Sequence, residues 1–205
     1  ENTNAEISTV VDVKATSLPY YMKDLIDILG VVKYVLPFGE KKGSKKGRYA
    51  LDDAFFKFWF SFIYKNLSYY EKGDFDFFKK KISKDFNTFV GFAFEEFCKN
   101  LIDRKKLKLS SKFDQVGKWW SRRGEEIDLV AANNSTKDIL FAECKWKDDV
   151  DAKKELETLR KKAGLVEWFK GRRKEHFAIF VKTVKNVPQD KDFLIFELKD
   201  LERSF

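Results

Sequence analysis

Three charged residues interrupt two apolar segments in the second half of the chain. Asp128 lies in the segment Ile-Asp-Leu-Val, and Glu143 and Lys145 lie in Phe-Ala-Glu-Cys-Lys-Trp. Buried strands rarely contain charged residues unless these are paired or bind a metal. Because residues two apart in a strand project from the same face, Glu143 and Lys145 are predicted to lie side by side. A hairpin between the two segments would bring Asp128 next to Glu143.

This set of side chains is suited to the hydrolysis of phosphodiesters. Carboxylate oxygens bind Mg²⁺ or Mn²⁺, such a metal neutralises phosphate charge and activates water, and a nearby lysine orients that water or stabilises developing charge. Glu95, in a predicted helix, would add a third carboxylate, so that three carboxylates and one lysine leave a charge of −2 for a divalent cation. The predicted catalytic residues are Glu95, Asp128, Glu143 and Lys145, and the first three are also the predicted metal ligands.

Two alternatives to this site remain open. The charged residues could form an internal ion-pair network without a metal, since Glu-x-Lys on its own is a common sequence. Glu96 could replace Glu95 as the carboxylate that the helix supplies. Glu126 is a further acidic residue predicted on the same face as Asp128.

Helices and strands in a recognisable order are predicted to position these residues. Apolar residues recur at helical spacing over 85–103 and 151–170, and Asn133-Asn134 is a strong turn signal. The predicted strands are 113–120, 126–132, 139–146, 177–181 and 193–196. The order of one helix, three strands, one helix and further strands predicts an α/β fold.

The first 51 residues predict two helices and a β-hairpin. Ser17 is a good N-cap for the second helix, Pro19 falls in its first turn, and Gly30 ends it. The predicted elements are helices at 4–13 and 17–29 and strands at 31–36 and 49–51. Two helices and a hairpin with a basic tip indicate a winged helix-turn-helix, whose wing lies along phosphates and minor grooves.

The hairpin loop at 38–48 concentrates positive charge, with a local balance of +4. The second helix carries Lys23 but also Asp24 and Asp27, so it is poorly suited to reading bases. Trp119-Trp120 could stack on DNA, but packing of at least one of the two in the core or at its rim is favoured. A lysine-rich loop can equally be a solvated one. The predicted DNA-binding residues are Lys41, Lys42, Lys45, Lys46, Arg48, Arg122 and Arg123.

The remaining distinctive residues favour structural roles. Residues 54–64 are almost wholly aromatic and apolar, which predicts burial between layers, with a stacking platform for single-stranded nucleic acid as the alternative. Cys144 is predicted in the core, on the face opposite Glu143. His176 has no obvious partner and is predicted to be non-catalytic, and the basic turn at 170–174 is predicted to be solvated.

Composition excludes several classes of protein. The chain has 205 residues and a net charge of +8, and it is 43% hydrophobic and 36% charged. It is therefore too apolar to be disordered and too charged to lie in a membrane, and without a signal-like N-terminus a cytoplasmic location is predicted. Two cysteines and one histidine cannot form a disulfide framework or a two-histidine zinc site.

These pieces together resemble the PD-(D/E)xK restriction-endonuclease-like fold, with Asp128 and Glu143-Cys-Lys145 in the place of its catalytic motif. The whole chain resembles the C-terminal region of the archaeal/bacterial P-loop ATPase family, in which a winged helix precedes such a nuclease-like domain. The matching stretches are Tyr49-Ala-Leu-Asp-Asp-Ala-Phe-Phe-Lys-Phe-Trp-Phe, Gly91-Phe-Ala-Phe-Glu95, Trp119-Trp120, Glu126-Ile-Asp-Leu-Val and Glu143-Cys-Lys-Trp146. Ile127 stands where the motif's name has proline.

The resemblance implies a mixed sheet flanked by helices and an overall division into three parts. A winged helix-turn-helix, truncated at its start, is expected at 1–51, a helical connector at 52–84 and the nuclease-like domain at 85–205. We expect a Mg²⁺- or Mn²⁺-dependent DNA nuclease, and the alternative is a non-catalytic DNA-binding or regulatory module of a P-loop ATPase. The sequence contains no P-loop of its own, so an ATPase domain is expected upstream in a longer parent chain.

Overall fold

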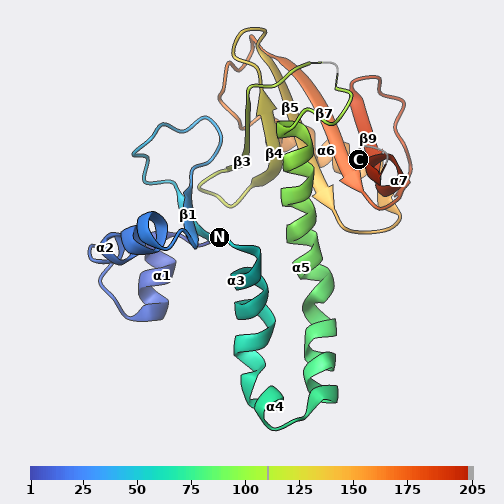
Figure 1. Ribbon diagram of the computed structural model, residues 1–205. Helices are drawn as coiled ribbons and strands as arrows, with labels where there is room; N and C mark the ends of the chain where they lie inside the picture. Colours follow the sequence, from blue (N-terminus) through green and yellow to red (C-terminus); the bar gives the residue numbers. More distant parts are fainter. Residues whose placement is uncertain (110, 203–205) are drawn as a thin grey trace. The chain divides into compact units, whose positions relative to one another are not determined.

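A computed structural model describes residues 1–109 and 111–202 of the protein (Figure 1). The chain divides into two compact units, Glu1–Phe86 and Asn87–Phe205, and the boundary falls within helix α5, which runs from Phe75 to Asp103. Among the described residues, no helix combines the length and the apolar character that crossing a membrane requires.

The N-terminal unit begins with two helices and a hairpin, as predicted. Helix α1 (Asn4–Val11) starts with a capping box in which Thr3 and Glu6 satisfy each other's backbone N–H groups. Helix α2 (Leu18–Lys23) continues into a π-helical turn, η1 (Asp24–Ile28), and strands β1 (Val32–Val35) and β2 (Arg48–Leu51) pair antiparallel. Ser17 precedes α2, but among the described contacts its side chain makes no capping hydrogen bond.

The loop between β1 and β2 packs against one aromatic ring. Tyr34 lies opposite Tyr49 in the hairpin, with ring centroids 5.0 Å apart, and its hydroxyl donates to the Ser44 carbonyl at 3.2 Å. The ring passes so close to Gly47 that a Cβ atom there would lie 2.2 Å from it. A side chain at position 47 is therefore excluded while Tyr34 keeps this place.

A helical hairpin completes the N-terminal unit. Its first arm comprises α3 (Ala54–Phe58), the π-helical η2 (Trp59–Ile63), η3 (Tyr64–Asn66) and α4 (Leu67–Glu71), and its second arm is the first part of α5. Aromatic rings join the arms, with Tyr69 and Phe77 4.4 Å apart and Phe62 and Phe86 6.2 Å apart. The helix predicted over 85–103 is thus the end of a longer one that starts ten residues earlier.

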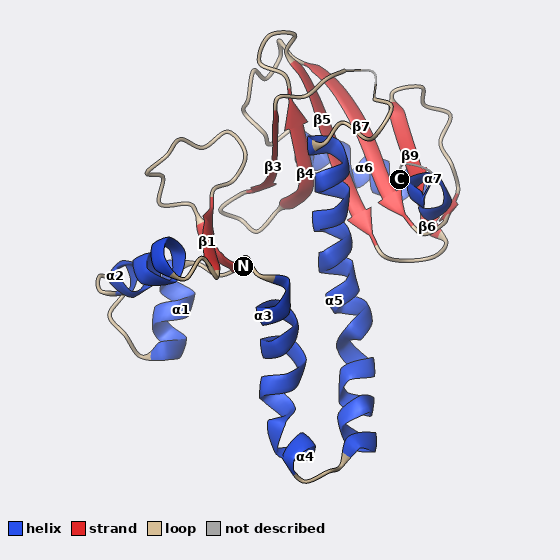
Figure 2. Ribbon diagram, in the orientation of Figure 1, coloured by secondary structure: helices blue, strands red, loops and turns tan. Residues whose placement is uncertain are grey.

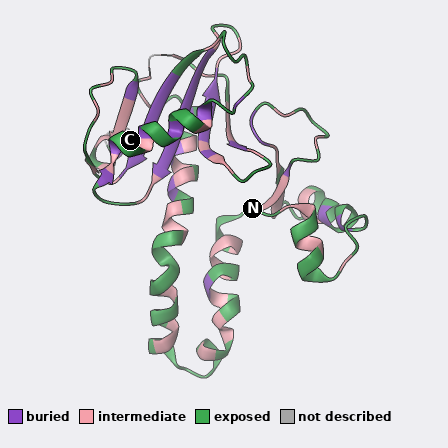
Figure 3. Ribbon diagram, turned by 180° about the vertical axis from the view of Figure 1, so that it is seen from behind, coloured by how far each residue is buried: buried purple, intermediate pink, exposed green. Residues whose placement is uncertain are grey.

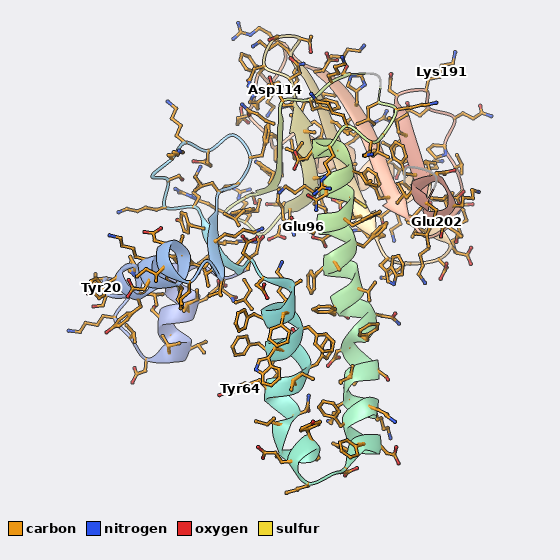
Figure 4. The ribbon with its side chains drawn as sticks, in the orientation of Figure 1. Tyr20, Tyr64, Glu96, Asp114, Lys191 and Glu202 are labelled. Carbon is orange, nitrogen blue, oxygen red and sulfur yellow. The ribbon has the colours of Figure 1, made fainter. Side chains whose placement is uncertain are left out.

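The predicted burial of the aromatic segment 54–64 is wrong. Within these residues, all of which the structure describes, Phe62 alone is buried, whereas Phe55 and Tyr64 are each 62% exposed. Figure 4 shows Tyr64 on the outer side of its helical turn. A hairpin of two helices offers each arm only one neighbour, so a helix that is apolar all round leaves aromatic surface uncovered.

The C-terminal unit is built on a mixed five-stranded sheet, which confirms the predicted α/β class (Figure 2). The strand order is β3-β4-β5-β7-β9; the first two pairings are antiparallel and the last two are parallel. The strands are β3 (Gln115–Trp120), β4 (Glu126–Ala132), β5 (Asp138–Lys145), β7 (Lys174–Val181) and β9 (Phe193–Glu197). The short strands β6 (Val150–Asp151) and β8 (Val184–Lys185) pair separately.

Helices cover both faces of this sheet, as Figures 1 and 3 show from opposite sides. On one face, α5 and α7 (Leu198–Glu202) pack onto the sheet, and this layer includes the predicted core residue Cys144. On the other face lies α6 (Ala152–Ala163), which connects β5 to the parallel strand β7. Helix α6 ends seven residues earlier than predicted, and Arg173 donates to the carbonyls of Ala163, at 2.9 Å, Val166 and Trp168 beyond its end. The side chain of Arg173 is buried, so the predicted solvation of the turn at 170–174 is wrong for this residue.

Candidate active site

The site lies where two neighbouring strands separate. The antiparallel pairing of β4 and β5 ends at Leu129 and Ala142. Beyond that point the start of β4 pairs only with β3, and the end of β5, from Glu143 to Lys145, pairs with β7. Asp128 occupies the resulting fork, where its Oδ2 accepts a hydrogen bond from the Cys144 backbone N–H at 2.9 Å. The carboxylate thus takes the part of a carbonyl that the ladder no longer supplies.

Lys145 joins the two carboxylates of the fork. Its Nζ lies 2.8 Å from Glu143 Oε2 and 3.7 Å from Asp128 Oδ2. The side chain of Glu143 is 3% exposed and that of Asp128 is 13% exposed, so these are desolvated ion pairs. The predicted neighbourhood of Asp128, Glu143 and Lys145 is present in the fold.

Helix α5 contributes Glu95 at the border of this cluster. Glu95 is half-buried and its Oε2 pairs with Lys118 Nζ, on β3, at 3.2 Å. Burial raises the pKa of Glu95, and the nearby Asp128 raises it further while Lys118 and Lys145 act against this. Glu96 faces solvent and pairs with Lys99 at 3.9 Å, so the helix turns Glu95, and not Glu96, toward the fork.

A second lysine that the sequence reasoning missed completes the cluster. Lys162, on α6, places its Nζ 2.7 Å from Glu143 Oε1. Each carboxylate oxygen of Glu143 therefore contacts one ammonium group, Oε1 that of Lys162 and Oε2 that of Lys145. The only sequence signal is the position of Lys162 three residues after the buried Leu159, at the edge of the apolar stripe of α6.

The surroundings of the fork raise the pKa of both Asp128 and Lys145, but for different reasons. Burial raises the pKa of Asp128 to about 6, and the Glu143 carboxylate adds to this, whereas Lys145 and the Cys144 N–H oppose it. Burial lowers the pKa of Lys145, but the adjacent Glu143 and Asp128 more than offset this, so that its pKa is raised overall. Lys145 is therefore a cation at neutral pH and not a general base.

The donor types in the fork suit a hard divalent cation, but they are engaged with lysines. Glu95, Asp128 and Glu143 supply the carboxylate oxygens that Mg²⁺ and Mn²⁺ bind. Within residues 1–109 and 111–202, no three His, Cys, Asp or Glu side chains are grouped as a metal site. A metal at Glu143 would share its oxygens with the ammonium groups of Lys145 and Lys162 or would displace one of them.

A hollow of about 420 Å³ opens beside Lys145. Four lysines and four carboxylates surround it together with Val150. The lining residues are Lys145, Lys147, Asp148, Asp149, Val150, Asp151, Lys154, Glu155 and Lys185. The end of β5 is therefore reachable from solvent next to the buried carboxylates.

The residues predicted to bind DNA are divided between the two units. Arg122 and Arg123 are exposed in the turn between β3 and β4 of the C-terminal unit, and the preceding Trp119 and Trp120 are buried. The five basic residues of the hairpin loop belong to the N-terminal unit. Lys41, Lys42, Lys45 and Lys46 are exposed there, Lys46 pairs with Glu40, and Arg48 is half-buried in β2.

The prediction that His176 has no partner is wrong. Its Nε2 lies 2.9 Å from Asp138 Oδ1, and both residues are buried. Hydrogen bonds from Thr136 and from His176 lower the pKa of Asp138. Asp138 starts β5, whereas Glu143 and Lys145 end it, so His176 lies at the opposite end of this strand from the candidate site.

The fold and the fork describe an α/β protein with a cluster of carboxylates and lysines where its sheet splits. A family described as "Archaea bacterial proteins of unknown function", DUF234, matches residues 59–158, a range that includes Glu95, Asp128, Glu143 and Lys145. The chain is also 39% identical, over 203 residues, to a protein of Methanocaldococcus jannaschii named "Uncharacterized protein MJECL04". That match covers 97% of this chain and 45% of the relative, so the chain spans about half of the relative's length. No solved structure matches the chain.

Proposed function

We propose that the C-terminal unit is a Mg²⁺- or Mn²⁺-dependent nuclease domain that hydrolyses phosphodiester bonds of DNA. The observation that carries the proposal is the convergence of the desolvated Asp128 and Glu143 on Lys145 at the split in the sheet. Such charges are costly to bury, and an uncharged side chain could equally accept the hydrogen bond that the Cys144 N–H donates to Asp128. The cluster is also adjacent to a hollow through which a phosphodiester could approach.

Asp128 and Glu143, with Glu95 from α5, are the residues that would hold the metal. A bound Mg²⁺ would neutralise charge on the phosphate and lower the pKa of a water molecule. Lys145 supplies a fixed positive charge for the phosphate oxygens, because its raised pKa keeps it protonated. Lys147, Lys154 and Lys185 line the same hollow and would contact flanking phosphates, while the four carboxylates of its lining would act against this attraction.

The N-terminal unit would bind DNA through its hairpin loop. Its two helices and β-hairpin are the parts expected of a winged helix-turn-helix, and the exposed lysines of the loop suit phosphates rather than bases. The PD-(D/E)xK resemblance of the C-terminal unit and the winged-helix resemblance of the N-terminal unit together support a nuclease with its own DNA-binding module.

The proposal is tested by titrating Mg²⁺ and Mn²⁺ against plasmid and branched DNA. Asp128→Ala and Glu143→Ala should abolish both cleavage and the rise in melting temperature that the metal causes. Lys145→Met should abolish cleavage but keep the metal response, because lysine is not a ligand. Glu95→Gln should weaken both, and Glu96→Gln is its matched control on the solvent side of the same helix. Absence of cleavage and of any metal response in the wild-type protein would refute the nuclease.

One observation favours a second candidate, a non-catalytic DNA-binding or regulatory module of a P-loop ATPase. Both oxygens of Glu143 contact lysines, so the ion-pair network is complete without a metal. In that case wild-type protein would bind DNA with no metal requirement, and the Asp128→Ala variant would bind it equally well.

A further inference from the structure

We propose that the Lys162 ammonium group pairs with the Glu143 carboxylate in the absence of metal and is displaced from it when a divalent metal binds. This inference rests on the proposed function, because it concerns how the same site acquires its metal. Lys162 pairs with Glu143 Oε1 at 2.7 Å, and its side chain is 25% exposed. A lysine so placed satisfies the buried carboxylate in the absence of metal and competes directly with a metal for the same oxygen.

Because the carboxylates and ammonium groups of the cluster balance in charge, binding of a metal favours the departure of a lysine side chain. Three carboxylates, on Glu95, Asp128 and Glu143, meet three ammonium groups, so that the cluster is neutral without a metal. The ion pairs are Glu95 with Lys118, Asp128 and Glu143 with Lys145, and Glu143 with Lys162. A metal beside the buried carboxylates of Asp128 and Glu143 would add two positive charges to ion pairs that already balance, and its repulsion of the ammonium groups favours the withdrawal of one of them.

Among the three lysines, Lys162 is the one placed to leave. Lys145 contacts two carboxylates and lies on the same strand as Glu143, and Lys118 pairs with Glu95. Within the described chain, Lys162 forms an ion pair with Glu143 alone, at the end of a flexible four-carbon stem. Its ammonium can swing away by rotation of the side chain while the backbone stays in place.

The backbone that carries Lys162 is fixed at both ends of α6. At the start of the helix, the Asp151 side chain accepts the Lys154 backbone N–H at 3.0 Å. At the end, the Arg173 guanidinium, almost wholly buried, donates to the Ala163 carbonyl at 2.9 Å. Leu159 and Ala163 are fully buried on either side of Lys162. The exchange therefore concerns the Lys162 side chain and leaves the helix unmoved.

The test is the affinity for Mn²⁺, measured in the absence of DNA by titrating free Mn²⁺ with electron paramagnetic resonance. Lys162→Met removes the competing charge and keeps the stem, so Mn²⁺ should bind about tenfold more tightly, or better, than to the wild type. Lys161→Met, on the exposed neighbour in the same helix, is the matched control and should leave the affinity unchanged. Adding Glu143→Gln to Lys162→Met should remove the gain, which would place the metal on Glu143.

Three results separate this inference from the nuclease proposal. If the wild type binds Mn²⁺ and Lys162→Met binds it no more tightly, the exchange is wrong and the nuclease proposal stands. If Lys162→Met binds Mn²⁺ and the wild type does not, Lys162 blocks the site permanently, and both the exchange and the nuclease proposal fail. If neither binds, both proposals fail. Should Lys162→Met unfold, Lys162→Gln keeps a donor for Glu143 without the charge and carries the same expectation.

Discussion

The two units of the chain bury their apolar residues to different extents. In the C-terminal unit the central strands are almost completely covered, and Phe141, Ile179 and Phe180 are inaccessible to solvent. In the N-terminal unit the helical hairpin is no less aromatic, yet Phe55 is 62% exposed (Figure 3). The difference follows from layers: a sheet with helices on both faces encloses its side chains, whereas two paired helices do not.

The units also treat charge differently. Buried charges in the C-terminal unit meet partners inside the fold, as Glu143 does with Lys145 and Lys162. In the N-terminal hairpin loop Lys41, Lys42 and Lys45 are exposed, and Lys46 pairs with Glu40 at the surface. Apolar content alone thus does not predict whether a side chain is buried. The number of layers around the residue decides this.

The largest effect is expected from truncating a core ring. Phe180 is completely buried and stacks on Phe196 with centroids 4.9 Å apart, so Phe180→Ala should lower the free energy of unfolding by about 3–5 kcal/mol. Phe55→Ala, the matched change on the exposed hairpin, should stay within about 0.5 kcal/mol. Urea unfolding followed by circular dichroism measures both, and equal losses would contradict the contrast between the units.

The next effect concerns the buried carboxylate of the fork. Because the pKa of Asp128 is raised from 3.8 to about 6, the folded state keeps a proton that the unfolded state has lost between these values. Stability therefore falls as the pH rises through this window. In metal-free buffer, Asp128→Asn should raise the free energy of unfolding by about 3 kcal/mol near pH 7.5 and by little near pH 4.

Thermal or urea unfolding at both pH values checks this prediction. Glu96→Gln serves as the control, since its carboxylate is 46% exposed and its removal should change neither value appreciably. A variant that is destabilised equally at both pH values would mean that Asp128 is needed for its hydrogen bond more than it is penalised for its charge.

A third expectation concerns the exposed loop of the N-terminal unit. If about four phosphate contacts form, the logarithm of DNA affinity should fall with the logarithm of salt at a slope near −3.6, from roughly −0.9 per contact. This corresponds to a loss of about 150-fold between 50 and 200 mM salt. Replacing Lys41, Lys42, Lys45 and Lys46 with Ala should remove most of the slope in a fluorescence anisotropy titration. An unchanged slope would show that other residues contact the phosphates, and Arg122 and Arg123 would be the next candidates.

The smallest effect is expected at the base of the same loop. Gly47→Ala would place a methyl group against the ring of Tyr34, which is 40% exposed and can swing outward, so a cost of about 1 kcal/mol or less is expected. Tyr34→Ala should remove this cost in the double variant. A loss of several kcal/mol would show instead that the ring is held in place by the rest of the hairpin.

Much of the C-terminal unit could be predicted from local pattern. Strand β4 has the predicted bounds, and β5 is displaced by one residue, because short apolar runs between turn signals specify strands well. The pair Asp128 and Glu143 could be predicted for the same reason, since only a hairpin separates them. Contacts between residues far apart in the sequence could not be predicted in this way. Lys162 contacts Glu143 from another element, and His176 contacts Asp138, which is 38 positions earlier in the sequence.

In the N-terminal unit the helices and strands could be predicted, but the exposure of their side chains could not. Its second helix could be predicted from Pro19 and Gly30, which act within a few positions, although, among the described contacts, Ser17 does not cap it. Whether Phe55 is covered depends on how many elements surround it, and periodicity contains no information on that number. The two π-helical turns, η1 and η2, were likewise missed, since no local residue type distinguishes them from ordinary helix.

The fork between β4 and β5 also gives the protein a natural spectroscopic probe. The Cys144 amide donates its hydrogen bond to the side-chain carboxylate of Asp128. Its proton chemical shift and its rate of exchange with deuterium therefore respond to whatever draws negative charge away from that oxygen. A single cross-peak in an amide spectrum can thus follow the charge state of Asp128 in solution, with neither substrate nor turnover required.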